Sequence, residues 1–145
     1  MPIQCEIVSQ DRNVFSGLVD MVLLPGVDGV MGILPHHSPI LTNLNFGVIT
    51  VITKTGREYF TVAGGVAEVQ PDQVTVLADA AENVEEIDED RAEKAKEKAE
   101  QLLKEIQSSD YADLNALKNA LRKSTLRLDA IKKFKKGRKI RGFGG

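Results

Sequence analysis

The adjacent histidines His36 and His37 are the first residues in this chain whose type could do chemistry. Imidazole side chains bind zinc and transfer protons near neutral pH. Side chains at neighbouring positions project in different directions, however, and no helix spaces these two with an acidic partner, as zinc hydrolases require. We therefore favour structural histidines in a proline-bounded surface loop over a metal site.

The glycine pair Gly64-Gly65 offers a second candidate, a phosphate-binding turn. Strand-like segments flank the pair on both sides and no helix follows it, so we expect a tight hairpin turn or a bulge instead. The chain also lacks the P-loop, the dinucleotide fingerprint and the Gly-x-Ser-x-Gly nucleophile elbow. The sequence therefore predicts a protein without catalytic residues and without a metal site.

Composition sets further bounds on the class of protein. The 145 residues, of which 42% are hydrophobic, suit one ordinary domain or a small domain with an appendage. No apolar run approaches the roughly 20 residues that span a bilayer, and no signal peptide is visible. Cys5 is the single cysteine. An intramolecular disulfide is therefore excluded, a Cys-based zinc site is disfavoured, and a reducing compartment fits.

The sequence predicts strands in its first half and helices in its second half. The first 84 residues contain short runs rich in Val, Ile, Thr and aromatic side chains, separated by turn formers. No helix of ten or more residues lies between these runs, so parallel crossovers are not expected. We predict an antiparallel β-sandwich or barrel over residues 1–84. The expected strands are residues 3–8, 19–24, 48–53, 58–63, 66–69 and 74–77.

The second half is helical in pattern. Residues 91–106 are strong helix formers, and Asp88 is suited to cap the first turn. Residues 108–110 break the pattern, and a second apolar stripe follows. This predicts an antiparallel two-helix hairpin over residues 85–136, a basic flexible tail over 137–145, and an α+β fold overall. The two stripes comprise Ala92, Ala95, Ala99, Leu102, Leu103 and Ile106, then Leu114, Leu117, Leu121, Leu128 and Ile131.

Charge divides the chain at the same place. Residues 1–84 carry three basic against nine acidic side chains, a net of −6, whereas residues 85–145 carry sixteen against twelve, a net of +4. A basic face on the second helix is either a solvated surface or a contact for an acidic partner, and the basic tail favours the partner. Its members are Arg122, Lys123, Arg127, Lys132, Lys133, Lys135 and Lys136.

Residues 31–42 form the most distinctive loop. Pro35 and Pro39 hold it extended, and apolar side chains lie on either side of the histidines. Such a segment either docks on another protein or only connects two strands.

Several motifs, in order, resemble the epsilon subunit of the F-type ATP synthase. They are Pro25-Gly26 followed by Gly29, then Gly32-Ile33-Leu34-Pro35-x-His37-x-Pro39-x-Leu41-Thr42, and Gly64-Gly65-Val66-Ala67-Glu68-Val69. The resemblance covers essentially the whole chain. His36 departs from it, because relatives often have glycine there, and the basic extension after Ile131 is longer than in many relatives.

The resemblance implies a non-catalytic rotor subunit of the central stalk that couples the catalytic head to the c-ring. Expected partners are the gamma subunit, the c-ring and the catalytic alpha and beta subunits, on the cytoplasmic face of a bacterial plasma membrane. The hairpin would extend to inhibit ATP hydrolysis. The docking residues carried over are Gly32, Pro35, His37, Ser38 and Pro39.

Ile87-Asp88-x-x-Arg91-Ala92 resembles a motif with which several bacterial epsilon subunits bind ATP. Arg91 would pair with phosphate, and Asp88 and Glu82 would accept hydrogen bonds. A capped helix start with an Arg–carboxylate pair produces the same residues without a ligand. We expect no required cofactor and treat ATP as a candidate regulatory ligand. The candidate nucleotide contacts are Glu82, Ile87, Asp88, Arg91, Ala92, Lys123 and Arg127. Where those relatives carry two arginines four residues apart, this chain aligns Asn119 and Lys123, with Arg122 or Arg127 nearby as substitutes.

A small β-barrel that binds nucleic acid through a basic arm is the alternative. It would need a basic, aromatic-studded sheet face. The three basic residues among the first 84 disfavour it.

Overall fold

A computed structural model describes residues 2–106 and 111–135 of the chain. The chain divides into two compact units, Met1–Asn83 and Val84–Gly145. We call them the β unit and the hairpin unit. The predicted tail at residues 137–145 lies outside the described residues.

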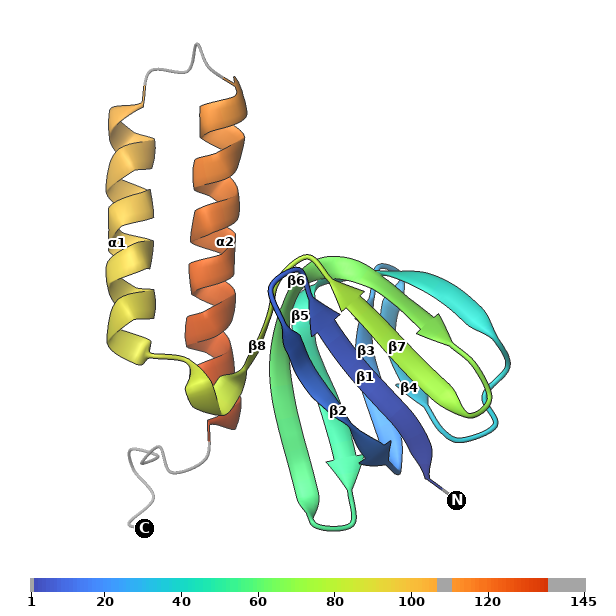
Figure 1. Ribbon diagram of the computed structural model, residues 1–145. Coiled ribbons are helices and arrows are strands. Elements are labelled where there is room, and N and C mark those ends of the chain that lie inside the picture. The colour runs from blue at the N-terminus through green and yellow to red at the C-terminus, as the bar shows by residue number, and fades with distance from the viewer. Residues whose placement is uncertain (1, 107–110, 136–145) are drawn as a thin grey trace. The chain divides into compact units, whose positions relative to one another are not determined.

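The β unit is one open sheet folded into a sandwich, as predicted (Figure 1). The strand order is β2-β1-β7-β6-β5-β3-β4, with β8 paired to β6. Because β2 and β4 remain as edges, the sheet does not close into a barrel. The strands are β1 Ile3–Ser9, β2 Asn13–Val19, β3 Met21–Gly26, β4 Gly29–Ile33, β5 Ile40–Thr53, β6 Gly56–Val69, β7 Gln73–Ala78 and β8 Ala81–Asn83.

The two long strands β5 and β6 run through the bend between the two layers of the sandwich. β6 pairs with β7 over residues 65–69 and with β8 over residues 60–62, while β5 follows it along its length. The strand bends at Gly64 and Gly65, whose φ angles are 89° and 136°. A Cβ on Gly65 would lie 2.4 Å from the Leu77 carbonyl oxygen. The expected hairpin turn is therefore wrong: the glycine pair bends one continuous strand where two backbones approach closely.

One strand pair departs from the antiparallel expectation. β1 and β7 run parallel, from Gln4 opposite Gln73 to Ser9 opposite Ala78. The expectation of wholly antiparallel pairing is therefore wrong for this one pair. The chain between β1 and β7 returns through the other strands of the sandwich instead of through a crossover helix.

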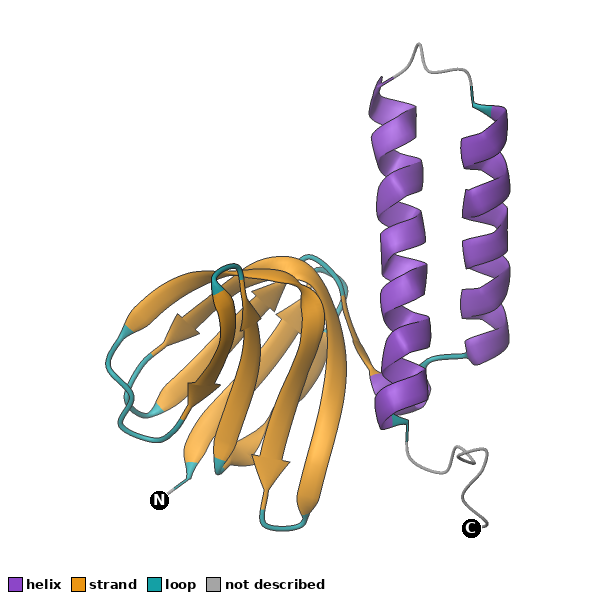
Figure 2. Cartoon of the chain, turned by 180° about the vertical axis from the view of Figure 1, so that it is seen from behind, coloured by secondary structure: helices purple, strands orange, loops and turns teal. Residues whose placement is uncertain are grey.

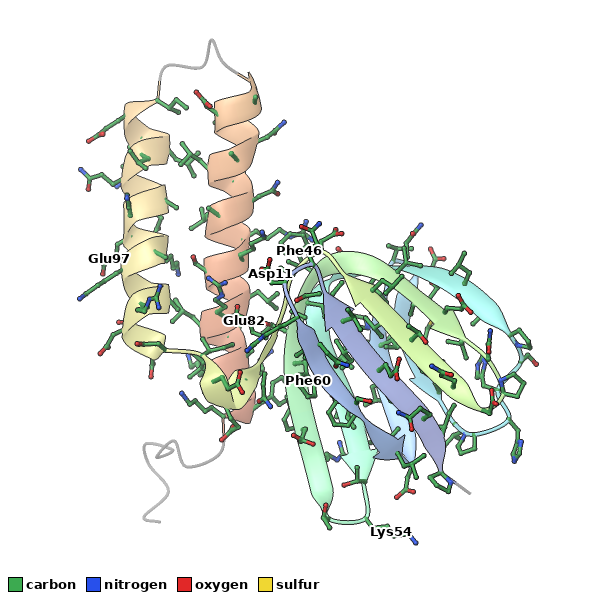
Figure 3. The ribbon with its side chains drawn as sticks, viewed as in Figure 1. Asp11, Phe46, Lys54, Phe60, Glu82 and Glu97 are labelled. Carbon is green, nitrogen blue, oxygen red and sulfur yellow. The ribbon has the colours of Figure 1, made fainter. Side chains whose placement is uncertain are left out.

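Alternating side chains of these strands fill the space between the layers. Ile3, Cys5 and Ile7 of β1 are all fully buried. Phe60 of β6, labelled in Figure 3, is also fully buried. Its ring meets that of Phe15 edge to face, with ring centroids 5.5 Å apart and an interplanar angle of 60°. This geometry is the one that aromatic pairs prefer.

The hairpin unit consists of a short 3-10 helix η1, Val84–Glu86, and two helices, α1 Glu89–Glu105 and α2 Tyr111–Phe134. The two helices pack side by side and antiparallel, which confirms the predicted hairpin (Figure 2). Asp88 is the N-cap of α1, as expected. Residues 108–110, predicted to break the helical pattern, lie outside the described residues.

Burial along the hairpin is uneven. Ala92 and Ala99 of α1 are 3% and 4% exposed, but Leu102 is 37% exposed and Ala95 is also exposed. On α2, Ala130 and Ile131 are buried, whereas Leu114, Leu117 and Leu121 are half-buried (the predicted stripe is therefore only partly covered). Glu97 points away from α2 (Figure 3). The seam is thus narrow and built largely from small side chains.

Candidate functional site

Asp88 and its neighbours form the start of α1. The Asp88 Oδ1 atom accepts a hydrogen bond from the Arg91 N–H at 3.2 Å, and the Asp88 carbonyl accepts from the Ala92 N–H at 3.0 Å. Ile87 and Ala92 are each 3% exposed. The motif residues therefore cap and pack the helix, and the Arg91 side chain is exposed.

Glu82 lies in a different part of the structure from the rest of this motif. It belongs to β8, opposite Thr61 of β6, and therefore to the β unit. Asp88 and Arg91 belong to the hairpin unit. Glu82 and the helix-start residues thus belong to different compact units.

The candidate cations on α2 lie at different heights along the hairpin. The Lys135 Nζ atom donates to the Ile87 carbonyl at 2.7 Å, which places the end of α2 beside the start of α1. At 1.5 Å of rise per residue, Arg127 is about 12 Å along α2 from this point and Lys123 about 18 Å. Arg91 is about 6 Å along α1 on the same reasoning. Arg127 is thus nearer than Lys123 to the height of Arg91.

The predicted basic face is not uniform. Arg122, Lys132 and Lys133 are exposed, Lys123, Arg127 and Lys135 are half-buried, and Lys136 lies outside the described residues. The ammonium group of Lys135 bonds within the hairpin, which the sequence analysis did not foresee. No sequence signal marks this role, because its partner is a backbone carbonyl 48 residues away.

The proline-bounded loop occupies residues 34–39, between β4 and β5. Pro35, His37, Ser38 and Pro39 lie in it, but Gly32 lies in β4. A Cβ at Gly32 would lie 2.6 Å from the Met21 Cε atom, so this glycine leaves space for the methionine.

Backbone hydrogen bonds hold the loop in place. The His36 N–H donates to the Pro71 carbonyl at 2.8 Å, and the His37 N–H donates to the Leu34 carbonyl at 3.2 Å. His36 has a φ of 70°, in the left-handed region that favours glycine. The loop thus lies against the β6–β7 turn, and His36 holds a backbone conformation that glycine adopts with less strain.

The His37 ring lies beside a backbone carbonyl of its own loop. The His37 Nδ1 atom lies 2.7 Å from the Ser38 carbonyl oxygen. Within residues 2–106 and 111–135, no group of three His, Cys, Asp or Glu side chains is placed to hold a metal ion. Over the same residues, no helix is long and apolar enough to cross a membrane.

Apolar side chains surround the loop on the surface of the β unit. Leu34, Ile40 and Leu41 are 54%, 40% and 70% exposed. A shallow groove beside them is lined by Pro39, Ile40, Leu41, Glu68, Val69 and Gln70. We call Leu34, Pro39, Ile40 and Leu41 the apolar rim. Apolar area of this kind, beside a loop fixed by its backbone, is suited to protein docking.

The two units define a class of protein: a β-sandwich domain followed by a helical hairpin. Comparisons with known proteins agree. The beta-sandwich domain of the ATP synthase Delta/Epsilon chain matches residues 2–84, and the long alpha-helix domain of the same chain matches residues 85–132.

Curated relatives and solved structures give the same result. The chain is 46% identical over 132 residues to the ATP synthase epsilon chain of Herpetosiphon aurantiacus, covering 91% of this chain and 96% of that protein. It is 42% identical over 134 residues to that of Psychrobacter arcticus, covering 92% and 96%. A chain in the cryo-EM structure of the Euglena gracilis mitochondrial ATP synthase with its c-ring aligns with a TM-score of 0.74 and 26% identity, covering 90% of this chain and 81% of that one.

The chain belongs to the ATP synthase delta/epsilon family and is an epsilon subunit of that complex. Its relatives are accessory subunits, so it contributes to the ATP synthase without catalytic residues of its own. A chain from the central stalk and c-ring of the Tetrahymena thermophila enzyme shares the fold, with a TM-score of 0.58 at 19% identity.

Proposed function

We propose that the β unit is the docking platform of a rotor subunit and contacts the gamma subunit and the c-ring through the apolar rim. The observation that supports this is the exposure of Leu34, Ile40 and Leu41 beside a loop whose backbone is fixed. The solved structures similar to this chain include a central stalk with its c-ring. His37 and Ser38 lie in the same loop and take part in the contact. The subunit then lies at the cytoplasmic face of a bacterial plasma membrane, peripheral to the bilayer.

The hairpin unit acts in this proposal as a regulatory arm that restrains ATP hydrolysis. It is a compact unit separate from the β unit, and its seam is narrow, so its states differ by a small free energy. The exposed basic side chains Arg122, Lys132 and Lys133 suit acidic surfaces on the catalytic alpha and beta subunits. Restraint of ATP hydrolysis by the hairpin unit is the central feature of the proposed function.

Truncation of the assembled enzyme tests the arm. A chain that ends at residue 85 keeps every strand of the β unit, and a chain that ends at residue 135 keeps both helices as a matched control. We expect faster ATP hydrolysis with the shorter chain and wild-type inhibition with the longer one. Equal ATPase rates for the full chain and the chain ending at residue 85 would contradict an inhibitory arm.

ATP is the proposed regulatory ligand of the hairpin, and no cofactor is required. Arg91 is exposed at the amino end of α1, where the helix dipole favours phosphate. Arg127 is the better placed of the two candidate cations on α2. Ile87 and Ala92 contribute packing, and Asp88 fixes the helix start and accepts hydrogen bonds.

Calorimetric titration of the full chain with ATP tests this part of the proposal. We expect binding that Arg91→Ala abolishes and that Lys94→Ala leaves unchanged, because Lys94 is an exposed cation one turn further along α1. No heat and no shift in melting temperature at millimolar ATP would remove the nucleotide from the account.

A further inference from the structure

The residue just beyond α2 reaches back to the start of the hairpin. Lys135 follows the last helical residue, Phe134, and its Nζ atom donates to the Ile87 carbonyl at 2.7 Å. We call this bond the clasp. It joins positions that lie 48 residues apart in the sequence, at the open end of the hairpin.

The Ile87 carbonyl needs a donor that α1 does not supply. The helix ladder begins one residue later, where the Ala92 N–H donates to the Asp88 carbonyl at 3.0 Å. Ile87 is 3% exposed, and its own N–H donates to the Val84 carbonyl at 3.3 Å. A buried carbonyl without a partner is costly, and a charged donor gives one of the stronger hydrogen bonds.

The end of α2 is held so that Lys135 can supply this donor. Its N–H donates to the Ile131 carbonyl at 3.1 Å, which closes the last helical turn, and Ile131 is 1% exposed. α2 also contacts η1. The first turn of α1 carries the acidic side chains Glu89 and Asp90, which suit the positive end of the α1 dipole.

We infer that Lys135 is a positioning residue, whose ammonium group holds residues 84–88 against the carboxyl end of α2 and keeps the base of the hairpin closed. The regulatory consequence rests on the ATP contact proposed above: Asp88 and Arg91 follow directly on the clasped segment. ATP and the clasp then stabilise the same closed state, so each strengthens the other by the same factor.

Amide hydrogen exchange in the full chain without nucleotide tests the clasp itself. The amides of Ile87 and Arg91, which bond to Val84 and Asp88, are the reporters. We expect the reporter amides to exchange about tenfold faster in Lys135→Met, because breaking a charged hydrogen bond lowers their protection by about this factor. In Lys135→Arg we expect near wild-type exchange. Lys132→Met is the matched control, because Lys132 is exposed in the same final turn. Equal exchange in Lys135→Met and Lys132→Met would overturn the clasp.

Titration of the same variants with ATP separates the clasp from the proposed function. We expect ATP to bind up to about tenfold more weakly to Lys135→Met than to Lys132→Met, by the reciprocity of linked equilibria. Tight binding to Lys135→Met despite fast exchange would overturn the link to the nucleotide. If the wild-type chain binds no ATP, the nucleotide proposal is wrong. The exchange experiment would still show whether Lys135 holds the base of the hairpin closed.

Discussion

The β unit and the hairpin unit bury different kinds of side chain. The β unit fully buries large ones such as Ile3, Leu24 and Phe60, each worth about 1.5–3 kcal/mol. The α1 side of the hairpin seam buries alanines, and leucines of α2 along the same seam remain half-exposed. The β unit is therefore stabilised by large buried side chains, whereas the hairpin seam buries smaller ones, and we expect the hairpin to be the less stable unit.

The two units also differ in how far apart in the sequence their contacting elements lie. In the β unit, strands distant in the sequence pair with each other, as β1 does with β7, so we expect this unit to unfold as a whole. The hairpin joins two helices that are neighbours in the sequence. Local opening of such a hairpin does not require the β-sandwich to unfold.

The largest expected effect comes from the centre of the platform. Phe60→Ala removes a fully buried ring and its contact with Phe15, and should lower the free energy of unfolding of the β unit by about 3–5 kcal/mol. Leu121→Ala in the hairpin should cost clearly less, because Leu121 is only half-buried. Urea unfolding followed by amide NMR signals of each unit measures both. Equal costs at the two positions would break the comparison.

Alanine substitutions at Gly65 and Gly56 test why the β6 strand requires glycine where it bends. Gly65→Ala places a Cβ 2.4 Å from the Leu77 carbonyl oxygen, whereas Gly56 has a similar φ of 140° but nothing within 4 Å. Overpacking costs about 1–3 kcal/mol, so Gly65→Ala should destabilise the β unit by about 2 kcal/mol more than Gly56→Ala. Urea unfolding of the two variants gives this difference. If the costs are equal, backbone conformation alone requires the glycines.

Alkaline pH should weaken the platform through Cys5. Burial, with a smaller contribution from the Glu6 carboxylate, raises the pKa of the Cys5 thiol from 9.0 to about 12. The unfolded chain releases this proton first, so the contribution is fully present below pH 9 and is lost as the pH rises toward about 12. Wild type should lose about 1.4 kcal/mol relative to Cys5→Ala by about pH 10. Urea unfolding at several pH values tests this, and parallel pH profiles for the two proteins would refute it.

The smallest effect belongs to the arm. Asp88→Ala removes the N-cap of α1 and should destabilise the hairpin by about 1 kcal/mol while leaving the β unit unchanged. Asp90→Ala, an acidic residue in the same first turn, is the control. Amide exchange along α1 reports the result. Similar exchange in both variants would mean that the cap contributes no more than general charge.

The spacing of apolar residues and the composition were enough to predict the β-sandwich and the helical hairpin, because strand formers and helix formers occupy separate halves of the chain. They did not predict β2 or β4, since Ser16, Gly17, Gly29 and Gly32 look like turn formers within those strands. Nor could they distinguish a bend at Gly64-Gly65 from a turn. That distinction depends on pairing with β7 and β8, which lie later in the chain.

The candidate site shows the same limit. Prolines marked the loop at residues 34–39, and the Asp88 cap followed from residue type and position. The left-handed backbone of His36 could not be read from a histidine. The role of Lys135 was equally hidden, because a lysine in a basic run looks like a surface residue until its carbonyl partner is known.

Native-state amide exchange of the full chain in rising urea tests the central claim most directly. We expect helix amides, such as those of Ala99 and Ser124, to exchange through a separate opening of lower free energy. Strand amides such as those of Phe60 and Val62 should then exchange only when the whole β unit unfolds. A single opening free energy shared by all these amides would contradict a fixed platform that carries a separately movable arm.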